Sequence, residues 1–210
     1  TLLWHHCLGH PSLPHLRGMH SRLLVSGLPR SLPSLPPSPA PSWLACVEVR
    51  QRAAPHSSSF PSMTAPLQTL YMDVWGLARV SGQGRERYFL LVVDDYMRYT
   101  TVFPLRSKGE GILQTFTLLD PPQQIGIAER HIGLVMEVAR TSMIHSAAPH
   151  FLWPFAVRYA AHQLNLWPHV SLPETSPTPL WMGKVADASM FRVWGSRAFV
   201  RDTSADKLSA

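Results

Sequence analysis

The sequence has few cysteines and no long hydrophobic run. Its 210 residues include only two cysteines, Cys7 and Cys46, which are too few for a disulfide framework. No apolar stretch approaches the roughly 18 residues of a membrane-spanning helix, so we expect no membrane partner. We also expect that the protein is not secreted, because no signal peptide precedes the first motif. The start at Thr1 rather than at Met suggests a piece of a longer chain.

Acidic residues are also scarce, because 13 Asp and Glu stand against 19 Lys and Arg and give a formal net charge of +6. This balance favours an anionic partner, with nucleic acid first. The charge alone also fits a basic protein that has no such partner. Hydrophobic residues make up 45% of the sequence, which is ample for a core. The length allows one domain of moderate size and a small module.

Proline is abundant but unevenly distributed among its 20 positions. Residues 28–42 alternate Pro with Ser, Leu and Ala, a composition that favours polyproline II and predicts a semi-rigid linker. A Ser/Pro-rich connector follows at 55–66. The histidine-rich residues 1–27 are too few for a core of their own, so a metal staple is physically reasonable there. The alternative is a loosely ordered, histidine-rich surface segment.

The globular core is expected to begin near Leu67 with three strands. Residues 70–75 alternate in character, residues 88–94 are densely apolar, and residues 99–105 are rich in β-branched and aromatic side chains. Turn residues separate these runs, so the pattern predicts a three-stranded antiparallel meander. A further strand is expected at 112–118.

Two helices are predicted after these strands. Residues 122–126 are interpreted as a loop, and a 3.6-residue apolar pattern then runs from Ile127 to about Ala147. Glu129 lies at the edge of this stripe in the first turn, where the helix dipole favours a carboxylate. A second helix is expected at about 151–166, with Pro154 in its first turn. Its inward-facing residues are predicted to be Trp153, Ala156, Ala160 and Leu164. A loop at 172–179 and a strand or hairpin at 189–201 complete the chain.

Several segments resemble, in the right order, the motifs of copia-type retrotransposon integrases. Residues 122–130, with the sequence PQQIGIAER, resemble the third catalytic segment of the retroviral-type integrase core. Residues 5–10 resemble the start of the pre-integrase zinc module. The first catalytic strand, the hairpin after it and the region beyond the core are matched by residues 70–76, 92–99, 180–184 and 191–200. Each motif alone is weak, but the ordered set is specific and covers nearly the whole chain.

The resemblance implies an α/β fold, namely a ribonuclease-H-like integrase core with a mixed sheet, truncated internally and preceded by a small zinc-finger-like module. The implied domains are a pre-integrase zinc-binding-like module with its linker, a connector, the catalytic core, and the start of a downstream integrase segment. Their boundaries are 1–54, 55–66, 67–170 and 171–210. The chain is accordingly interpreted as a polyprotein fragment.

The resemblance also assigns the acidic residues. Integrases of this family hold two divalent cations, Mg²⁺ or Mn²⁺, with three carboxylates. By motif, Asp73 is the first carboxylate and Glu129 is the third. The family's second Asp lies on a block of helix, strand and helix that the five residues 106–110 cannot form, so this block is interpreted as deleted. Ile125 is a further departure, because the family has Asn there.

Other acids were weighed as replacements. Asp94 and Asp95 are close in the predicted hairpin, but the family keeps an acidic pair there in addition to its second catalytic Asp. Asp120 occupies a loop position that is small and neutral in the family. The alternatives for Asp73 and Glu129 are therefore a two-metal site, a one-metal site, or solvated carboxylates without a metal.

By the same resemblance, His5, His10 and Cys46 are expected to bind Zn²⁺. The family's remaining ligand position holds Trp43, so binding is expected to be weakened. Cys7 fills the gap only if its loop rearranges. The other histidines of this segment are interpreted as ordinary exposed residues: His6, His15 and His20.

Basic residues provide the predicted nucleic-acid contacts. Arg85, Arg87, Arg130 and Arg140 are placed to neutralise DNA phosphates without reading the base sequence, and the alternative is a solubilising surface. The expected partners are element ends and target DNA, with a homo-oligomer as a further option. The expected location is the nucleus, or a retrotransposon particle in the cytoplasm.

The functional prediction is a retrotransposon integrase-derived protein. Its ancestral activity is 3′ processing and strand transfer of DNA, which we expect this chain to lack because the second acidic ligand is missing. The first alternative is a non-enzymatic nucleic-acid-binding or oligomerising remnant. The second is an unfolded product of a decayed gene, since losing a central strand exposes sheet edges that invite aggregation.

Overall fold

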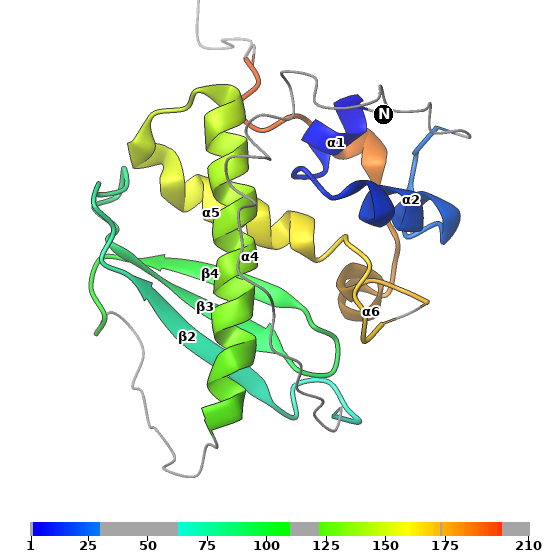
Figure 1. The fold of residues 1–210 in the computed structure, drawn as a ribbon, viewed down its shortest axis with the longest axis horizontal. Coiled ribbons are helices and arrows are strands. Elements are labelled where there is room, and N and C mark those ends of the chain that lie inside the picture. The colour runs from blue at the N-terminus through cyan, green and yellow to red at the C-terminus, as the bar shows by residue number, and fades with distance from the viewer. Residues whose placement is uncertain (1, 30–62, 110–121, 173, 199–210) are drawn as a thin grey trace, which may run out of the picture.

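The computed structural model describes residues 2–29, 63–109, 122–172 and 174–198 (Figure 1). Most of the predicted linker, Trp43, Cys46, the predicted strand at 112–118 and Asp120 lie outside these residues. The helices are α1 Leu2–Cys7, α2 Leu13–Ser21, α4 Pro122–Ser146, η2 His150–Leu152, α5 Trp153–Leu164, α6 Pro177–Met182 and η3 Ala188–Met190. The strands are β1 Val25–Ser26, β2 Leu70–Gly76, β3 Tyr88–Asp94, β4 Thr100–Leu105 and β5 Ala186–Asp187. None of the described helices is long and apolar enough to cross a membrane.

The central sheet is the predicted antiparallel meander. Its strand order is β2-β3-β4, and each strand pairs antiparallel with its neighbour. Phe89, Leu91 and Val93 of the middle strand are fully buried. Helix α4 crosses the sheet over β2 and β3, and α5 packs on α4 and on β4 (Figure 1). Alternate residues of a strand point to the same sheet face, and the buried face selects apolar side chains there. The sequence patterns of these segments therefore predicted strands correctly.

The α/β class is confirmed, but the expected mixed sheet is not found in the described part of the chain. The three-stranded sheet there is entirely antiparallel. The parallel pairing that the structure describes joins β1 to β5, which have two residues each, and it lies outside the main sheet. The ribonuclease-H-like topology therefore stays a prediction.

Helix α4 begins earlier than predicted, because the expected loop at 122–126 is helical. Proline is well tolerated at the start of a helix, and a Cβ added at Gly126 would meet no atom within 4 Å. Gly126 therefore lowers the stability of the helix only through its weak helix propensity, by about 1 kcal/mol relative to Ala. As a result, Glu129 lies beyond the first turn, which has no acidic residue, and the expected dipole role for Glu129 is wrong.

The second helix matches its prediction, whereas the C-terminal segment does not. Helix α5 has proline in its first turn, and Ala156 and Ala160 are fully buried as expected. The predicted loop at 172–179 instead leads into α6 at Pro177, and this helix ends at the left-handed Gly183. The predicted strand at 189–201 is absent from its described part, where η3 starts with the Asp187 side chain accepting from the Ser189 N–H.

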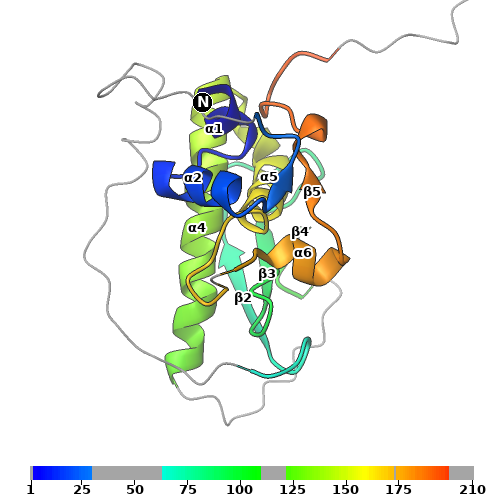
Figure 2. The ribbon, with the colours of Figure 1, turned by 90° about the vertical axis from the view of Figure 1, so that its right-hand side faces the viewer.

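Two buried clusters form the hydrophobic interior. The larger one joins the sheet to α4 and α5, and the smaller one contains Leu8, Leu16, Met19, Val25, Leu166 and Ala188. Trp167 contacts both clusters, and its indole N–H donates to the Leu8 carbonyl at 3.0 Å. Figure 2 shows α1 and α2 lying beside α5 and β5. The described N-terminal residues are thus docked on the core and not loosely ordered. The assignment of residues 1–54 to a separate zinc-binding-like module stays a prediction.

Candidate metal sites

The first predicted catalytic residue, Asp73, lies in the middle of β2 opposite Leu91. Strand alternation places it on the same sheet face as Tyr71, which is buried, and Trp75, which packs against the core. This is the face that α4 covers. Asp73 is half-buried, and its Oδ1 accepts the Val74 N–H at 2.7 Å.

The second predicted catalytic residue, Glu129, is exposed on α4 beside the buried Ala128. Because α4 contacts β2, the two carboxylates are carried by touching elements. Within the described residues, however, no group of three metal-ligating side chains includes either acid. The geometry therefore provides a pair of acids on adjacent elements and not a complete acidic triad.

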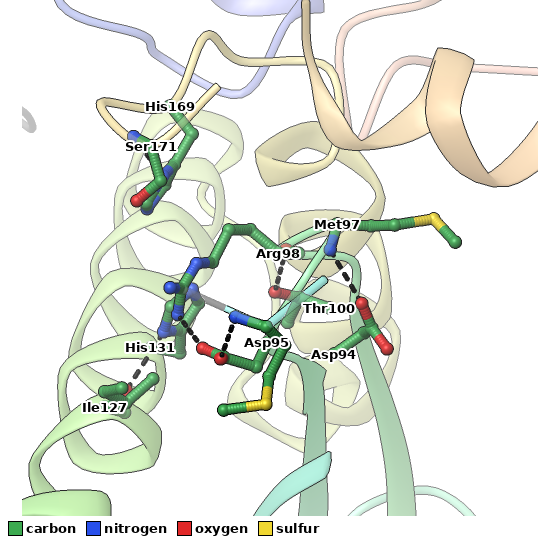
Figure 3. Close-up of polar contacts among 10 residues, drawn as sticks. Asp94, Asp95, Met97, Arg98, Thr100, Ile127, His131, His169 and Ser171 are labelled. Atoms are coloured by element: carbon green, nitrogen blue, oxygen red, sulfur yellow. Dashed lines mark hydrogen bonds and ion pairs between the residues drawn. The ribbon is translucent and has the colours of Figure 1, made fainter. Parts of the chain in front are cut away.

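The acidic pair at the end of β3, Asp94 and Asp95, forms hydrogen bonds and an ion pair within the fold (Figure 3). The Asp94 carboxylate accepts the Leu67 N–H at 2.6 Å and the Met97 N–H at 2.7 Å, and it is only 3% exposed. Asp95, also 3% exposed, forms an ion pair with Arg98 at 2.7 Å. These contacts hold the β3–β4 turn and the chain entering β2. Both carboxylates are thus engaged in contacts within the fold.

Two histidines that the sequence did not single out lie beside Arg98 (Figure 3). His131 on α4 has its Nδ1 3.0 Å from the Ile127 carbonyl, which it can approach only as a donor, and its ring stacks on His169 at 6.3 Å. Burial lowers the pKa of His131, and it lowers the pKa of His169 to about 4, with further lowering from His131, Arg98 and Arg130. Both rings are therefore neutral at pH 7.

Among the residues that the structure describes, a cluster of three histidines brings metal-ligating atoms together. The ligand atoms of His5, His6 and His10 all lie within 4.8 Å of one another. Helix α1 carries the first two, and the left-handed conformations of Gly9 and His10 turn the chain back so that His10 Nδ1 lies 3.1 Å from His5 Nε2. His5 Nδ1 lies 3.0 Å from the Pro11 carbonyl, to which it donates.

The surroundings of this cluster correct three sequence interpretations. His6 is not an ordinary exposed residue, because it is half-buried and its ring lies 4.1 Å from that of His145 at the end of α4. His15 is partly buried, with Nδ1 2.6 Å from the Ser12 hydroxyl, and His20 contacts the Pro29 carbonyl at 2.9 Å. In the sequence, the only indication that His6 belongs to this cluster was its position next to His5. No neighbouring residue in the sequence indicates that His145 lies beside it.

The donor set fits a borderline divalent cation such as zinc. Imidazole nitrogen is a preferred zinc ligand, and a ligating histidine commonly donates its other ring N–H to a carbonyl, as His5 does to Pro11. Cys7 is buried but is not part of this group. The cluster could therefore hold a metal ion such as Zn²⁺, whereas the ligand role of Cys46 lies outside the described residues.

The predicted DNA-contacting arginines fall into two places. Arg140 lines an open hollow of about 370 Å³ at one end of the sheet, together with a further arginine, Arg79, and with Trp75 and Trp153. Arg87 joins this region through its Nε, which donates to the Ala78 carbonyl at 3.1 Å, and Arg85 lies exposed in the same β2–β3 connection. Arg130 lies elsewhere on α4, near His131 and His169.

Comparison with known proteins finds distant similarity to retrotransposon polyproteins. The Retrovirus-related Pol polyprotein from transposon RE2 of Arabidopsis thaliana is 25% identical over 241 residues, which cover 93% of this chain and 16% of the relative. The corresponding polyprotein from transposon RE1 is 24% identical with the same coverage. That from transposon TNT 1-94 of Nicotiana tabacum is 23% identical and covers 94% of this chain and 18% of the relative.

This chain thus spans only 16–18% of the length of these curated relatives. No family model matches the sequence, and no solved structure matches it significantly. The similarity to the polyproteins nevertheless extends over nearly all of the chain. Across most of its length, this protein is a distant relative of copia-type retrotransposon Pol polyproteins.

Proposed function

We propose that this chain is the integrase-derived part of a retrotransposon Pol polyprotein, and that it binds DNA without performing strand transfer. The relation to Pol polyproteins and the order of the integrase-like motifs support the origin. Such a protein would act on element or target DNA in the nucleus or within a cytoplasmic retrotransposon particle. The observation that carries the loss of catalysis is the incomplete acidic site.

Strand transfer of this kind needs two divalent cations about 4 Å apart to stabilise the attacking and leaving oxygens. Asp73 and Glu129 supply two carboxylates, and Mg²⁺ or Mn²⁺ would be the fitting ion. Two further acids in the described part of the chain are engaged, Asp94 by backbone N–H groups and Asp95 by Arg98. This arrangement supports at most weak binding of one cation.

The alignments support a missing internal block. The 241 aligned positions exceed the 210 residues of this chain, so the relatives carry internal segments that it lacks. The short sequence at 106–110 is where the motif order places such a gap. Losing this block would remove the second metal ligand together with the elements that position it.

DNA binding is supported by the basic end of the sheet. The β2–β3 connection is pinned to the helices, because the Trp153 indole donates to the Val80 carbonyl at 3.0 Å and the Gln83 N–H donates to the Phe151 carbonyl at 3.2 Å. Arg79 and Arg140 both line the hollow beside this connection. Neighbouring guanidinium groups on a fixed surface can neutralise successive phosphates and release counterions.

The test is a pair of assays on the full chain. We expect no Mn²⁺-dependent cleavage of duplex DNA, and we expect binding that weakens steeply with salt. Replacing both Arg79→Gln and Arg140→Gln should reduce the slope of log affinity against log salt by about 1–2, while Arg17→Gln on α2 should leave it unchanged. Cleavage that Asp73→Asn abolishes would overturn the loss of catalysis, and an unaltered slope would overturn the proposed interface.

A further inference from the structure

We propose that the open hollow beside α4 is a binding site for a nucleoside monophosphate unit, that is, a flat ring that carries a phosphate group. The hollow measures about 370 Å³ and lies between the end of β2, α4 and the start of α5. This volume falls within the range of about 300–1,000 Å³ that small-ligand sites occupy. The inference goes beyond the DNA interface proposed above, although both use Arg79 and Arg140.

Two indoles form the wall that would bind the ring. Trp75 stacks on the buried Phe89, with ring centroids 5.3 Å apart and an interplanar angle of 25°. Trp153 meets Trp75 edge to face at 5.8 Å, and its N–H donates to the Val80 carbonyl at 3.0 Å. Both indoles are only partly buried and line the hollow. Because these contacts fix the indoles before binding, a flat ring can stack on them at little cost in side-chain entropy.

Apolar side chains continue this wall to the opening. Leu77 is 58% exposed and Val80 is 44% exposed, and the partly buried Met136 and Met143 line the α4 side. Phosphate groups alone would require only the arginines, because they are bound through charge and hydrogen bonds. Apolar and aromatic walls with a few polar groups are instead typical of sites that enclose a ring.

The charged groups at the hollow are all basic. Arg79, Arg140 and His150 are exposed, and none of the described residues that line the hollow is acidic. Neither arginine forms an ion pair with a carboxylate of the described residues. Guanidinium groups bind phosphate oxygens through several N–H donors. Two of them beside an imidazole suit a phosphate dianion better than a carboxylate, which carries a single charge.

The first experiment tests whether both halves of the ligand are needed. The full chain is titrated by calorimetry with thymidine 5′-monophosphate, with thymidine and with deoxyribose 5-phosphate. We expect saturable binding of the nucleotide, and binding at least about tenfold weaker for each of the other two. Equal affinity for either fragment, or no saturable binding, would overturn the proposal. Salt-dependent binding of blunt duplex DNA in the same preparation would then leave the DNA interface standing.

Matched variants locate the site. Replacing both Arg79→Gln and Arg140→Gln should lower the affinity for the nucleotide to that for thymidine, whereas Arg17→Gln on α2 should not. Leu77→Gln should weaken binding by about threefold through lost apolar contact. Leu67→Gln is the control, because Leu67 is also 58% exposed and does not line the hollow. Neither leucine is buried, so a folding defect cannot explain the difference, and equal affinities for these two variants would overturn the proposed location.

A competition experiment identifies the source of the nucleotide. A base within a duplex is stacked on both faces, so only a free nucleotide or an unpaired nucleotide of a DNA strand can present a face to an indole. If a duplex with a thymidine overhang displaces the mononucleotide and one with an abasic overhang does not, the ligand is part of a strand. If neither DNA displaces it, the ligand is a free nucleotide. Equal displacement by both DNAs would show that phosphates suffice, which would overturn the proposal.

Discussion

At the residue scale, the acidic side chains divide according to what their oxygens contact. Asp94 is buried and accepts two backbone N–H groups, whereas Asp73 is half-buried and accepts one from its own neighbour in the strand. A carboxylate of the first kind belongs to the turn that it closes. A carboxylate of the second kind remains available to solvent or a cation.

Asp94→Ala should therefore destabilise the protein, because two backbone donors lose the buried carboxylate that accepts from them. The expected loss is about 2–3 kcal/mol in the free energy of unfolding. Asp73→Asn keeps an acceptor oxygen and should change stability by less than about 0.5 kcal/mol. Urea unfolding of both variants checks this, and equal losses would contradict the assignment of Asp94 to structure.

The stacked pair His131 and His169 predicts a pH dependence. The folded-state pKa of His169 is about 4, below the ordinary value of 6.5, so the unfolded chain binds the proton first as the pH falls. The stability that the neutral ring provides is complete above pH 6.5 and is lost progressively towards pH 4. Between pH 7 and pH 5, His169 should account for a loss of at most about 2 kcal/mol.

His169→Gln removes the titrating group and should flatten the stability profile in that window. The measurement is urea unfolding of both proteins at pH 7, 6 and 5. The exposed His150→Gln is the matched control and should keep the profile of the unmutated protein. Parallel profiles for His169→Gln and the unmutated protein would show that His169 titrates normally in the folded state.

At the element scale, α4 organises the molecule, since it covers the sheet, packs on α5 and presents His145 at its last turn. Two glycines at or near this helix differ in backbone conformation and in the space available for a side chain. Gly133 is exposed in the helix interior, and a Cβ there would meet no atom within 4 Å. Gly9 has φ +75°, and a Cβ there would lie 2.8 Å from Gln163.

Gly133→Ala should consequently stabilise the protein by roughly 0.5–1 kcal/mol, because alanine restricts the unfolded chain and favours the helix. Gly9→Ala should destabilise it, through both the left-handed backbone and the close contact with Gln163. Thermal unfolding midpoints should move in opposite directions. A lower midpoint for Gly133→Ala would argue against a continuous α4 helix at this position.

At the scale of the whole molecule, the sheet face turned away from α4 keeps large apolar side chains exposed. Met72 is 58% exposed and Phe103 is 48% exposed, and both are register neighbours of residues on β3. We propose that copies of the chain, if they associate, meet through this face. A large exposed apolar patch on a soluble domain commonly marks an interaction site.

The double variant Met72→Lys with Phe103→Lys should reduce self-association while leaving the thermal unfolding midpoint within a few degrees, because neither side chain is buried. Analytical ultracentrifugation over a concentration series measures the association. Leu3→Lys, at another exposed apolar position, serves as the control. If the double variant associates as strongly as the unmutated protein, this face is not the contact between copies.

Part of this fold was accessible from the sequence because local patterns determine it. Strand alternation and turn residues predicted the meander, and Pro154 with its apolar spacing predicted α5. The pairing of His5 with His10 came from the family resemblance, and the structure places their ring nitrogens 3.1 Å apart. The beginning of α4 was missed because proline and glycine occur in loops as well as at helix starts, and only packing separates the two cases.

Period-two alternation leaves one question open, namely which set of residues faces the core. Leu70 and Met72 are the more apolar set of β2, yet the structure exposes them and turns Tyr71 inward. Helix α4 packs on the face that carries Tyr71, so that face is the buried one. Similarly, neither the joining of His6 to His145 nor the engagement of Asp94 by the Leu67 N–H leaves a local pattern. The sequence by itself determined the three-strand meander, helix α5 and the distant relation to Pol polyproteins, because periodicity and motifs are local. Only the tertiary structure decided the partners of the buried polar groups, because those contacts join residues far apart in the chain.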